Sequence, residues 1–241
     1  MCPYSSPDYR LSPQNKYPAA LQDCVDVYLS ITRKFDSNYD QVIPNFTPKK
    51  IIVFGDSAGG HFSLALGRVL NKLDIELPTQ MIFLYPAITG AIRSNVVSCL
   101  MTTTDIPVTV ALLYNCPDAY SPEGPNNNGV DYSEDRTPWY RRDIDNICRR
   151  VEEINAKLTT DEIYNPLLGD VSCFANTKLA VIASQFDPVL DEAIEICKKW
   201  PQPVDFDVAE GLPHAFVIDT GKYGQVAFEK FLSRLKAMAV E

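Results

Sequence analysis

The chain has 241 residues, of which 46% are hydrophobic and 22% charged, and its formal net charge at pH 7 is −9. This size and composition predict a globular protein with an ample core, and the negative charge argues against nucleic acid or an anionic membrane surface as the main partner. The first residues, MCPYSSPDYR, lack the charged and apolar regions of a secretory leader, no apolar run is long enough to span a bilayer, and the seven scattered cysteines include no C-x-x-C pair. We therefore expect a cytoplasmic protein with free thiols and no transmembrane segment.

Apolar strands and amphipathic helices alternate along most of the chain. A helix is predicted from Tyr17 to about Lys34, because apolar residues there recur at helical spacing. Further strands are expected at 50–54, 80–85, 179–184 and 204–211, and further helices at 61–73, 188–199 and 223–238. Since most of these strands are short apolar runs, they predict a parallel sheet with helices on both faces.

Residues 88–165 interrupt this alternation. They contain the Pro-, Asn- and acid-rich stretch 121–138, which predicts a loop. A charged helix is expected at 141–158, and its polar side chains suit a solvated face. We expect a single α/β domain over residues 1–241, with 88–165 inserted over the strand ends as a cap.

The stretch Gly55-Asp56-Ser57-Ala58-Gly59 stands between a predicted strand and a predicted helix. It matches G-x-S-x-G, in which a tight turn presents a serine nucleophile and requires very small residues two positions before and after the serine. The N–H of Ala58 and the start of the helix would then face the oxyanion that develops on an attacked ester. The alternative is a glycine-rich turn that only packs the helix on the strand, and the flanking pattern disfavours it.

A nucleophilic serine needs a base, and the chain has two histidines. His214 follows a predicted strand in the loop GLPHAF, so we expect it to be the base. His61 lies on the helix that follows Ser57, and we expect it to be a packing residue or one that supports the site without contacting the substrate.

The base in turn needs a carboxylate that orients it. Asp187 follows the strand at 179–184 and is the expected carboxylate. Asp191 and Glu192 lie within the next helix, and we expect them to cap it or lie on its surface. The order Ser…Asp…His along the chain is that of the α/β-hydrolase fold, and the chemistry it implies is acyl transfer through an acyl-enzyme.

Several stretches resemble the hormone-sensitive-lipase-like group of α/β-hydrolases, which includes arylacetamide deacetylases and many microbial esterases. They are DYRLSP (8–13), YPAALQD (17–23), GDSAGG (55–60), YPA (85–87), NPLLG (165–169), FDPVLDEA (186–193) and GLPHAF (211–216). The resemblance implies a serine carboxylesterase or lipase that acts on uncharged acyl esters, with Ser57, Asp187 and His214 as its triad. No cofactor is expected, and the histidines and cysteines lack the spacing of a metal site.

The group's oxyanion loop, an HGGG-type run upstream of DYRLSP, has no counterpart in this sequence. Losing one such donor costs about 10²–10³-fold in turnover, and here only the Ala58 N–H is expected to remain. The N-terminal strands of the fold are expected to be missing as well, which would leave residues 51–54 as an exposed edge open to self-association. Three explanations stay open: a fragment of a longer esterase, a naturally shortened homologue with weak or no activity, or a site rebuilt by residues 1–7 or the middle insertion.

The substrate is less well defined by the sequence. Phe216, close to His214, is the expected substrate contact, and the alternative is a core position. The resemblance permits acylglycerols or sterol esters at a lipid droplet or membrane surface, but hydrolysis of short-chain esters is the expected activity, because the group shares it. The alternative function is a catalytically weak or inactive binding or interaction protein that keeps the hydrolase scaffold.

Overall fold

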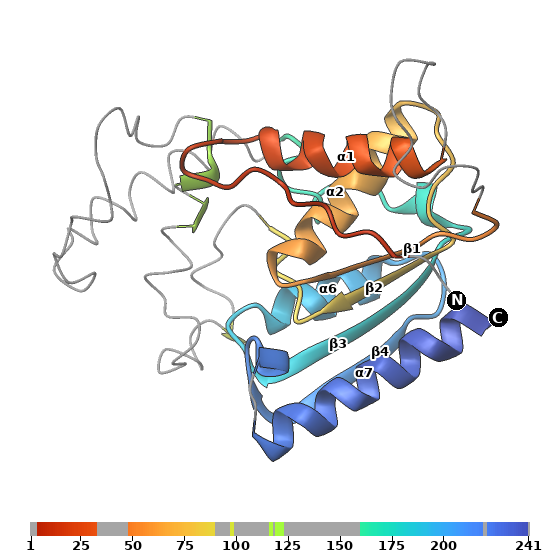
Figure 1. Cartoon of the computed structure of the whole chain (residues 1–241). Helices are drawn as coiled ribbons and strands as arrows, with labels where there is room; N and C mark the ends of the chain where they lie inside the picture. The colour runs from red at the N-terminus through yellow and green to blue at the C-terminus, as the bar shows by residue number, and fades with distance from the viewer. Residues whose placement is uncertain are drawn as a thin grey trace, which may run out of the picture.

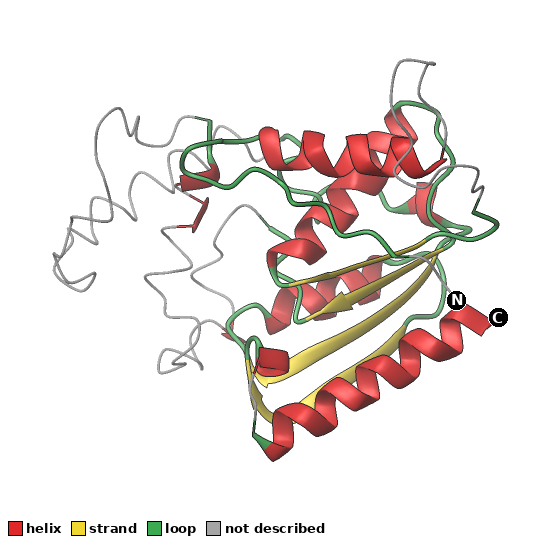
Figure 2. Ribbon diagram, in the orientation of Figure 1, coloured by secondary structure: helices red, strands yellow, loops and turns green. Residues whose placement is uncertain are grey.

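The computed structural model describes residues 4–32, 48–89, 97–98, 116–117, 119–122, 160–218 and 221–240. The helix expected at 141–158, nearly all of the loop 121–138 and most of the cap expected at 88–165 lie outside the described residues. The described part is a parallel sheet with helices packed on both faces (Figure 1, Figure 2).

The strands follow one another across the sheet in chain order, β1-β2-β3-β4, and every neighbouring pair is parallel. Their bounds are Ile52–Asp56 for β1, Gln80–Leu84 for β2, Lys178–Phe186 for β3 and Asp205–Pro213 for β4. The expected parallel strands are confirmed, with their ends shifted by at most two residues. Because the strands are parallel, the residues that follow them, among them Ser57, Asp187 and His214, gather at one edge of the sheet.

The helices cover the two faces unequally. Their bounds are Ala19–Thr32 for α1, Ala58–Lys72 for α2, Leu190–Lys199 for α6 and Lys222–Val240 for α7, with short 3₁₀ turns η2 at Ser172–Phe174 and η3 at Phe216–Ile218. Helix α7 runs along one face of the sheet, and α2 and α6 lie on the other, with α1 packed outside α2 (Figure 1). Helix α2 begins earlier than expected, because the turn at Ser57 leads directly into it.

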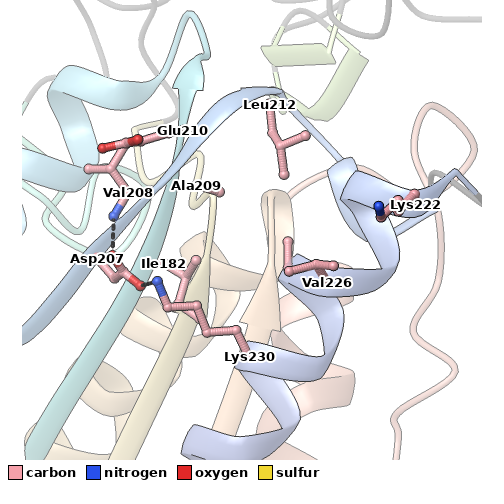
Figure 3. Close-up of a pocket in the computed structure, with 10 residues that line it drawn as sticks. Ile182, Asp207, Val208, Ala209, Glu210, Leu212, Lys222, Val226 and Lys230 are labelled. Carbon is pink, nitrogen blue, oxygen red and sulfur yellow. Dashed lines mark hydrogen bonds and ion pairs between the residues drawn. The ribbon is translucent and has the colours of Figure 1, made fainter.

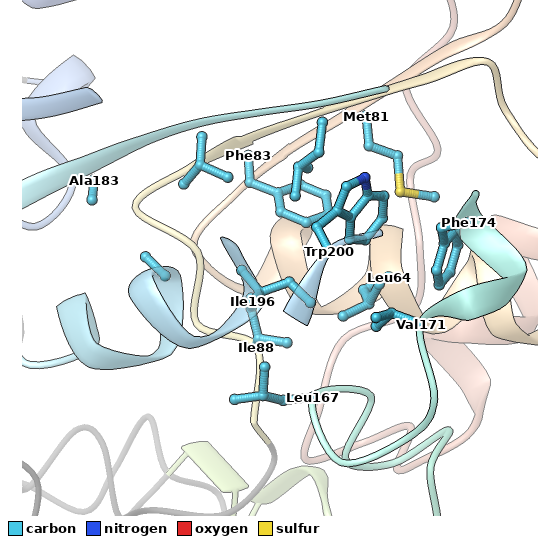
Figure 4. Packing of buried hydrophobic residues seen from close by; sticks show 13 residues of the cluster. Leu64, Met81, Phe83, Ile88, Leu167, Val171, Phe174, Ala183, Ile196 and Trp200 are labelled. Carbon is cyan, nitrogen blue, oxygen red and sulfur yellow. The ribbon is translucent and has the colours of Figure 1, made fainter. Parts of the chain in front are cut away.

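Alternate residues of β2 and β3 point to opposite faces, as the two-residue period of a strand requires. On the side of α2 and α6 they build a buried cluster that includes Leu64, Phe83, Val181 and Ile196 (Figure 4). On the side of α7 they build a second cluster that includes Ile82, Ile182 and Phe231. Each fully buried side chain of this kind contributes about 1.5–3 kcal/mol, so both faces anchor the strand ends that carry the candidate site.

Candidate active site

The turn at Ser57 joins β1 to α2 in a strained conformation. Its φ is 50° and its ψ is −118°, a backbone conformation that residues other than glycine rarely adopt. The N–H of Ser57 donates to the carbonyl of Leu84 at 3.0 Å, and its carbonyl accepts from the N–H of Gly60 at 2.9 Å. These bonds to the neighbouring strand and to the helix hold the serine hydroxyl outward, at the carboxyl edge of the sheet.

The glycines of this turn are not equivalent. A Cβ on Gly55 would lie 2.2 Å from the backbone of Gly59, and a Cβ on Gly60 would lie 2.5 Å from the Cβ of Pro86. A Cβ on Gly59, in contrast, would meet only the Asp56 carboxylate, at 3.9 Å. The expectation that the residue two positions after the serine must be very small is therefore wrong, because the close approaches fall on Gly55 and Gly60.

The side chains of Ser57, His214 and Asp187 meet at this edge. Nε2 of His214 lies 2.7 Å from Oγ of Ser57, and Nδ1 of His214 lies 2.8 Å from Oδ2 of Asp187. His214 is 4% exposed and Asp187 is 1% exposed, so the imidazole–carboxylate pair is shielded from water. Since a carboxylate only accepts, the Nδ1–H donates to Asp187, and Nε2 is left to accept from the serine hydroxyl.

Asp187 is held by the start of the helix that follows it. Its Oδ1 accepts the N–H of Val189 at 3.0 Å, which leaves Oδ2 for the histidine. One carboxylate therefore both shapes its own turn and orients the imidazole. The structure brings together the three side chains that the sequence selects, and their catalytic roles stay a prediction.

Tyr85 is a part of the site to which the sequence assigned no specific contact. It follows β2 with a φ of 31°, and its ring centroid lies 4.9 Å from that of His214 and 5.1 Å from that of Phe216. The phenol makes a long hydrogen bond of 3.5 Å to Asp56, and burial raises the pKa of Tyr85 above its usual range. The sequence signals for Tyr85 are its position at the end of a buried strand before Pro86 and its place in the YPA stretch.

The two remaining predicted site residues differ in their surroundings. Ala58 is exposed and is the first residue of α2, where N–H groups lack an acceptor within the helix. Phe216 is 1% exposed in η3 and packs in the cluster on the α7 side. This burial agrees with the core alternative for Phe216, and its contact with substrate, like the oxyanion role of Ala58, stays a prediction.

His61 is a packing residue, as expected. It is 5% exposed, and its Nδ1–H donates to the carbonyl of Ile88 at 2.7 Å. Burial disfavours the imidazolium and lowers the pKa of His61 to about 4. His61 is therefore neutral at physiological pH and makes no hydrogen bond to Ser57.

The acidic pair after Asp187 departs from the expectation of surface or capping residues. Glu192 is 8% exposed, and its carboxylate accepts hydrogen bonds from residues that follow β2 rather than from its own helix. Asp191 accepts the N–H of Ser98 at 2.8 Å. The expectation for Glu192 is wrong because the first turn of α6 packs against another segment of the chain.

A separate hollow of about 520 Å³ lies between β4 and α7 (Figure 3). Its walls are mainly aliphatic, with Lys222 and the ion pair of Lys230 with Asp207 among the lining groups. None of the three side chains that meet at the carboxyl edge lines this hollow. It is therefore distinct from the candidate active site.

A strained serine turn after a parallel strand, with an aspartate and then a histidine later in the chain, is the arrangement of the α/β-hydrolase class. The profile of a family described as "alpha/beta hydrolase fold" matches residues 1–218. The chain therefore belongs to this family.

Proteins similar to this chain include some that are named as hydrolases or lipases. The chain is 36% identical over 80 residues to the putative acetyl-hydrolase LipR of Mycobacterium tuberculosis and 28% identical over 119 residues to the hormone-sensitive lipase of Mus musculus. These matches cover 33% and 49% of this chain, but 23% and 15% of the two relatives. An esterase from Pyrobaculum calidifontis superposes with a TM-score of 0.69 at 21% identity over 97% of this chain and 65% of that one, which confirms the fold.

Proposed function

We propose that this chain hydrolyses uncharged carboxylic esters through an acyl-enzyme formed on Ser57. The observation that carries the proposal is the continuous pair of hydrogen bonds from Ser57 through His214 to Asp187, at 2.7 and 2.8 Å. The chain spans less than two thirds of the length of these relatives, so the activity is proposed for this chain and not transferred from them.

Acylation begins when Oγ of Ser57 attacks the ester carbonyl carbon and the hydroxyl proton passes to Nε2 of His214. The imidazolium that forms is stabilised by Asp187, because its Nδ1–H already donates to that carboxylate. The Ala58 N–H, at the positive end of α2, donates to the oxyanion of the tetrahedral intermediate. The intermediate then collapses, and the Nε2 proton passes to the leaving alcohol.

Deacylation repeats these steps with water as the nucleophile. His214 takes a proton from the water as it attacks the acyl carbon, and it returns that proton to Oγ of Ser57 when the carboxylic acid leaves. The buried Asp187–His214 pair supports both halves of the reaction, because the same imidazole alternates between base and acid.

The relatives and the site favour a catalyst over the alternative of an inactive binding or interaction protein. The matched relatives carry names such as carboxylesterase, esterase and lipase. Small acyl esters are the proposed substrates, and lipid esters at a droplet or membrane surface are a narrower form of the same proposal.

The test is hydrolysis of p-nitrophenyl acetate by the wild-type chain and by Ser57→Ala. We expect the substitution to lower kcat by at least about 10⁴-fold, because the nucleophile is removed. Ser63→Ala is the matched control, since this buried hydroxyl lies on the helix that follows Ser57 and donates to the carbonyl of Gly59 at 2.7 Å. Equal rates for the wild type and Ser57→Ala would show that the proposal is wrong, and labelling of Ser57 by a fluorophosphonate would support it independently.

We also propose that the chain self-associates through β1 and resides in the cytoplasm. Within the described sheet β1 pairs with β2 only, and Phe54 on β1 is 54% exposed.

The proposed location in the cytoplasm is supported by four described cysteines that are free thiols, which suits a reducing compartment: Cys24, Cys116, Cys173 and Cys197. Among the described helices, none is long and apolar enough to cross a bilayer.

A further inference from the structure

The segment that follows β2, residues 85–89, touches both the nucleophile turn and the base. The N–H of Ala87 donates to the carbonyl of Ser57 at 3.0 Å. The ring of Tyr85, two residues earlier, packs against His214. A shift of this short segment would therefore move Ser57 and His214 relative to one another.

The other end of the segment is held by a buried carboxylate on α6. Oε2 of Glu192 accepts the N–H of Ile88 at 2.6 Å and the N–H of Thr89 at 2.9 Å. Oε1 of Glu192 accepts the hydroxyl of Thr89 at 2.6 Å. Both oxygens of Glu192 therefore accept hydrogen bonds from this segment.

A second side chain, on helix α2, forms a hydrogen bond to the same segment. The Nδ1–H of His61 on α2 donates to the carbonyl of Ile88, whose N–H donates to Glu192. Ile88 is thereby tied on one side to the helix that begins at the nucleophile and on the other side to the helix that follows Asp187. Helices α2 and α6 are joined through the backbone of a single residue.

We propose that Glu192 is a positioning residue that holds segment 85–89, and through it Ser57, in line with His214. This inference rests on the proposed function, because it assigns Glu192 to the same reaction. Asp187 and Glu192 stand on one short stretch of chain: the first orients the base, and the second orients the backbone that carries the nucleophile. The role of Glu192 requires no contact with the substrate.

The effect of substitution follows from the geometry. Glu192→Ala removes three acceptor contacts, and displacements of about 1 Å at a reacting centre cost on the order of 10²-fold. We expect kcat to fall about 10–100-fold with KM within about twofold of wild type. Glu192→Gln keeps the length and one acceptor oxygen, so it should restore part of kcat.

Asp191→Asn is the matched control, because Asp191 is the preceding acid on the same helix turn and accepts the N–H of Ser98 instead. It should keep the wild-type kcat. The pH midpoint of kcat/KM should stay within about 0.3 of wild type in Glu192→Ala, since the Asp187–His214 pair is untouched. A purely structural residue would lower the melting temperature and leave kcat per titrated active site unchanged, and that result would overturn the proposal.

Amide hydrogen exchange provides a readout that does not depend on catalysis. The N–H groups of Ile88 and Thr89 should exchange at least about tenfold faster in Glu192→Ala than in Asp191→Asn. Unchanged protection of these two N–H groups would overturn the proposed contact. The proposed function fails separately, if the wild-type chain neither hydrolyses esters nor is labelled at Ser57. If Glu192→Ala does not fold, Glu192→Gln is measured in the same way, together with Thr89→Val, which removes the hydroxyl that bonds to Glu192 and keeps the backbone N–H.

Discussion

Ser57, Tyr85 and Ala215 all carry side chains in a left-handed backbone conformation, with φ of 50°, 31° and 58°. Each such residue costs about 1–3 kcal/mol. Two of the three have backbone N–H groups bonded across strands, Ser57 to Leu84 and Tyr85 to Ile182. At the scale of single residues, three of the four described non-glycine residues with positive φ, the fourth being Asp74, thus lie where the chain leaves the sheet near His214, and the sheet supplies the bonds that hold two of them.

Asp187→Asn tests how the carboxylate acts on the base. The amide can still accept the Val189 N–H, but its NH₂ group would face Nδ1 and favour the tautomer with the proton on Nε2. We expect kcat for a p-nitrophenyl ester to fall about 10⁴-fold with little change in the melting temperature. A kcat within tenfold of wild type would contradict the assigned role of Asp187.

His61 makes stability depend on pH in a defined direction. Its pKa is about 4 in the folded chain and near the ordinary 6.5 when unfolded, so the unfolded state binds the extra proton between these values. The part of the stability that depends on neutral His61 is therefore fully present above about pH 6.5 and is lost as the pH falls toward 4. From pH 7 to 5, the free energy of unfolding should fall about 2 kcal/mol more in wild type than in His61→Asn, as measured by urea denaturation. Parallel pH curves for the two proteins would refute this.

At the scale of elements, the join between β1 and α2 depends on contact between backbones. Gly55 and Gly59 approach so closely that no side chain fits on Gly55, and Gly60 lets the start of α2 lie against Pro86. The helix therefore begins at Ala58, immediately after the nucleophile, and its positive end faces the substrate side.

The two glycines of the motif provide a matched test of this join. Gly55→Ala places a methyl group 2.2 Å from backbone atoms, so the turn must open, and we expect loss of both Ser57 labelling and thermal stability. Gly59→Ala meets nothing closer than 3.9 Å and replaces a helical glycine, so stability should stay equal or rise by up to about 1 kcal/mol. Equal damage from the two substitutions would mean that the turn is not limited by Gly55.

At the scale of the whole molecule, the described sheet ends at β1 on one side and at β4 on the other. Phe54 on β1 is half exposed although its ring lies 5.8 Å from that of Phe231, a buried residue of α7. An edge strand with an exposed aromatic side chain favours pairing with a second chain. This is the physical basis of the proposed self-association.

Sedimentation equilibrium tests the assembly. We expect a concentration-dependent dimer for wild type and a shift toward monomer in Phe54→Lys, because a charge at the edge opposes strand pairing. Phe206→Lys is the control, since Phe206 is also exposed but lies on β4, at the opposite edge. A wild-type chain that stays monomeric at all concentrations would rule out the proposal.

Much of the fold could be predicted because its determinants are local. The apolar runs that became β2 and β3 are short and bounded by turn residues, and the repeat of apolar positions from Ala20 to Tyr28 marks α1 directly. The residues that follow each strand could also be selected in advance, because parallel strands end at one edge. This reasoning selects Ser57, Asp187 and His214, and the structure has hydrogen bonds between them.

The sequence by itself therefore determined the parallel α/β order of this chain and the side chains that stand at its carboxyl edge. Only the tertiary structure decided what holds them. Glu192 reads as a surface residue of a helix, yet it is buried because α6 packs against Ile88, which is 104 residues away along the chain. Periodicity reports which face of a helix is apolar, but a hydrogen bond between distant segments depends on how the elements pack, and no local pattern encodes that.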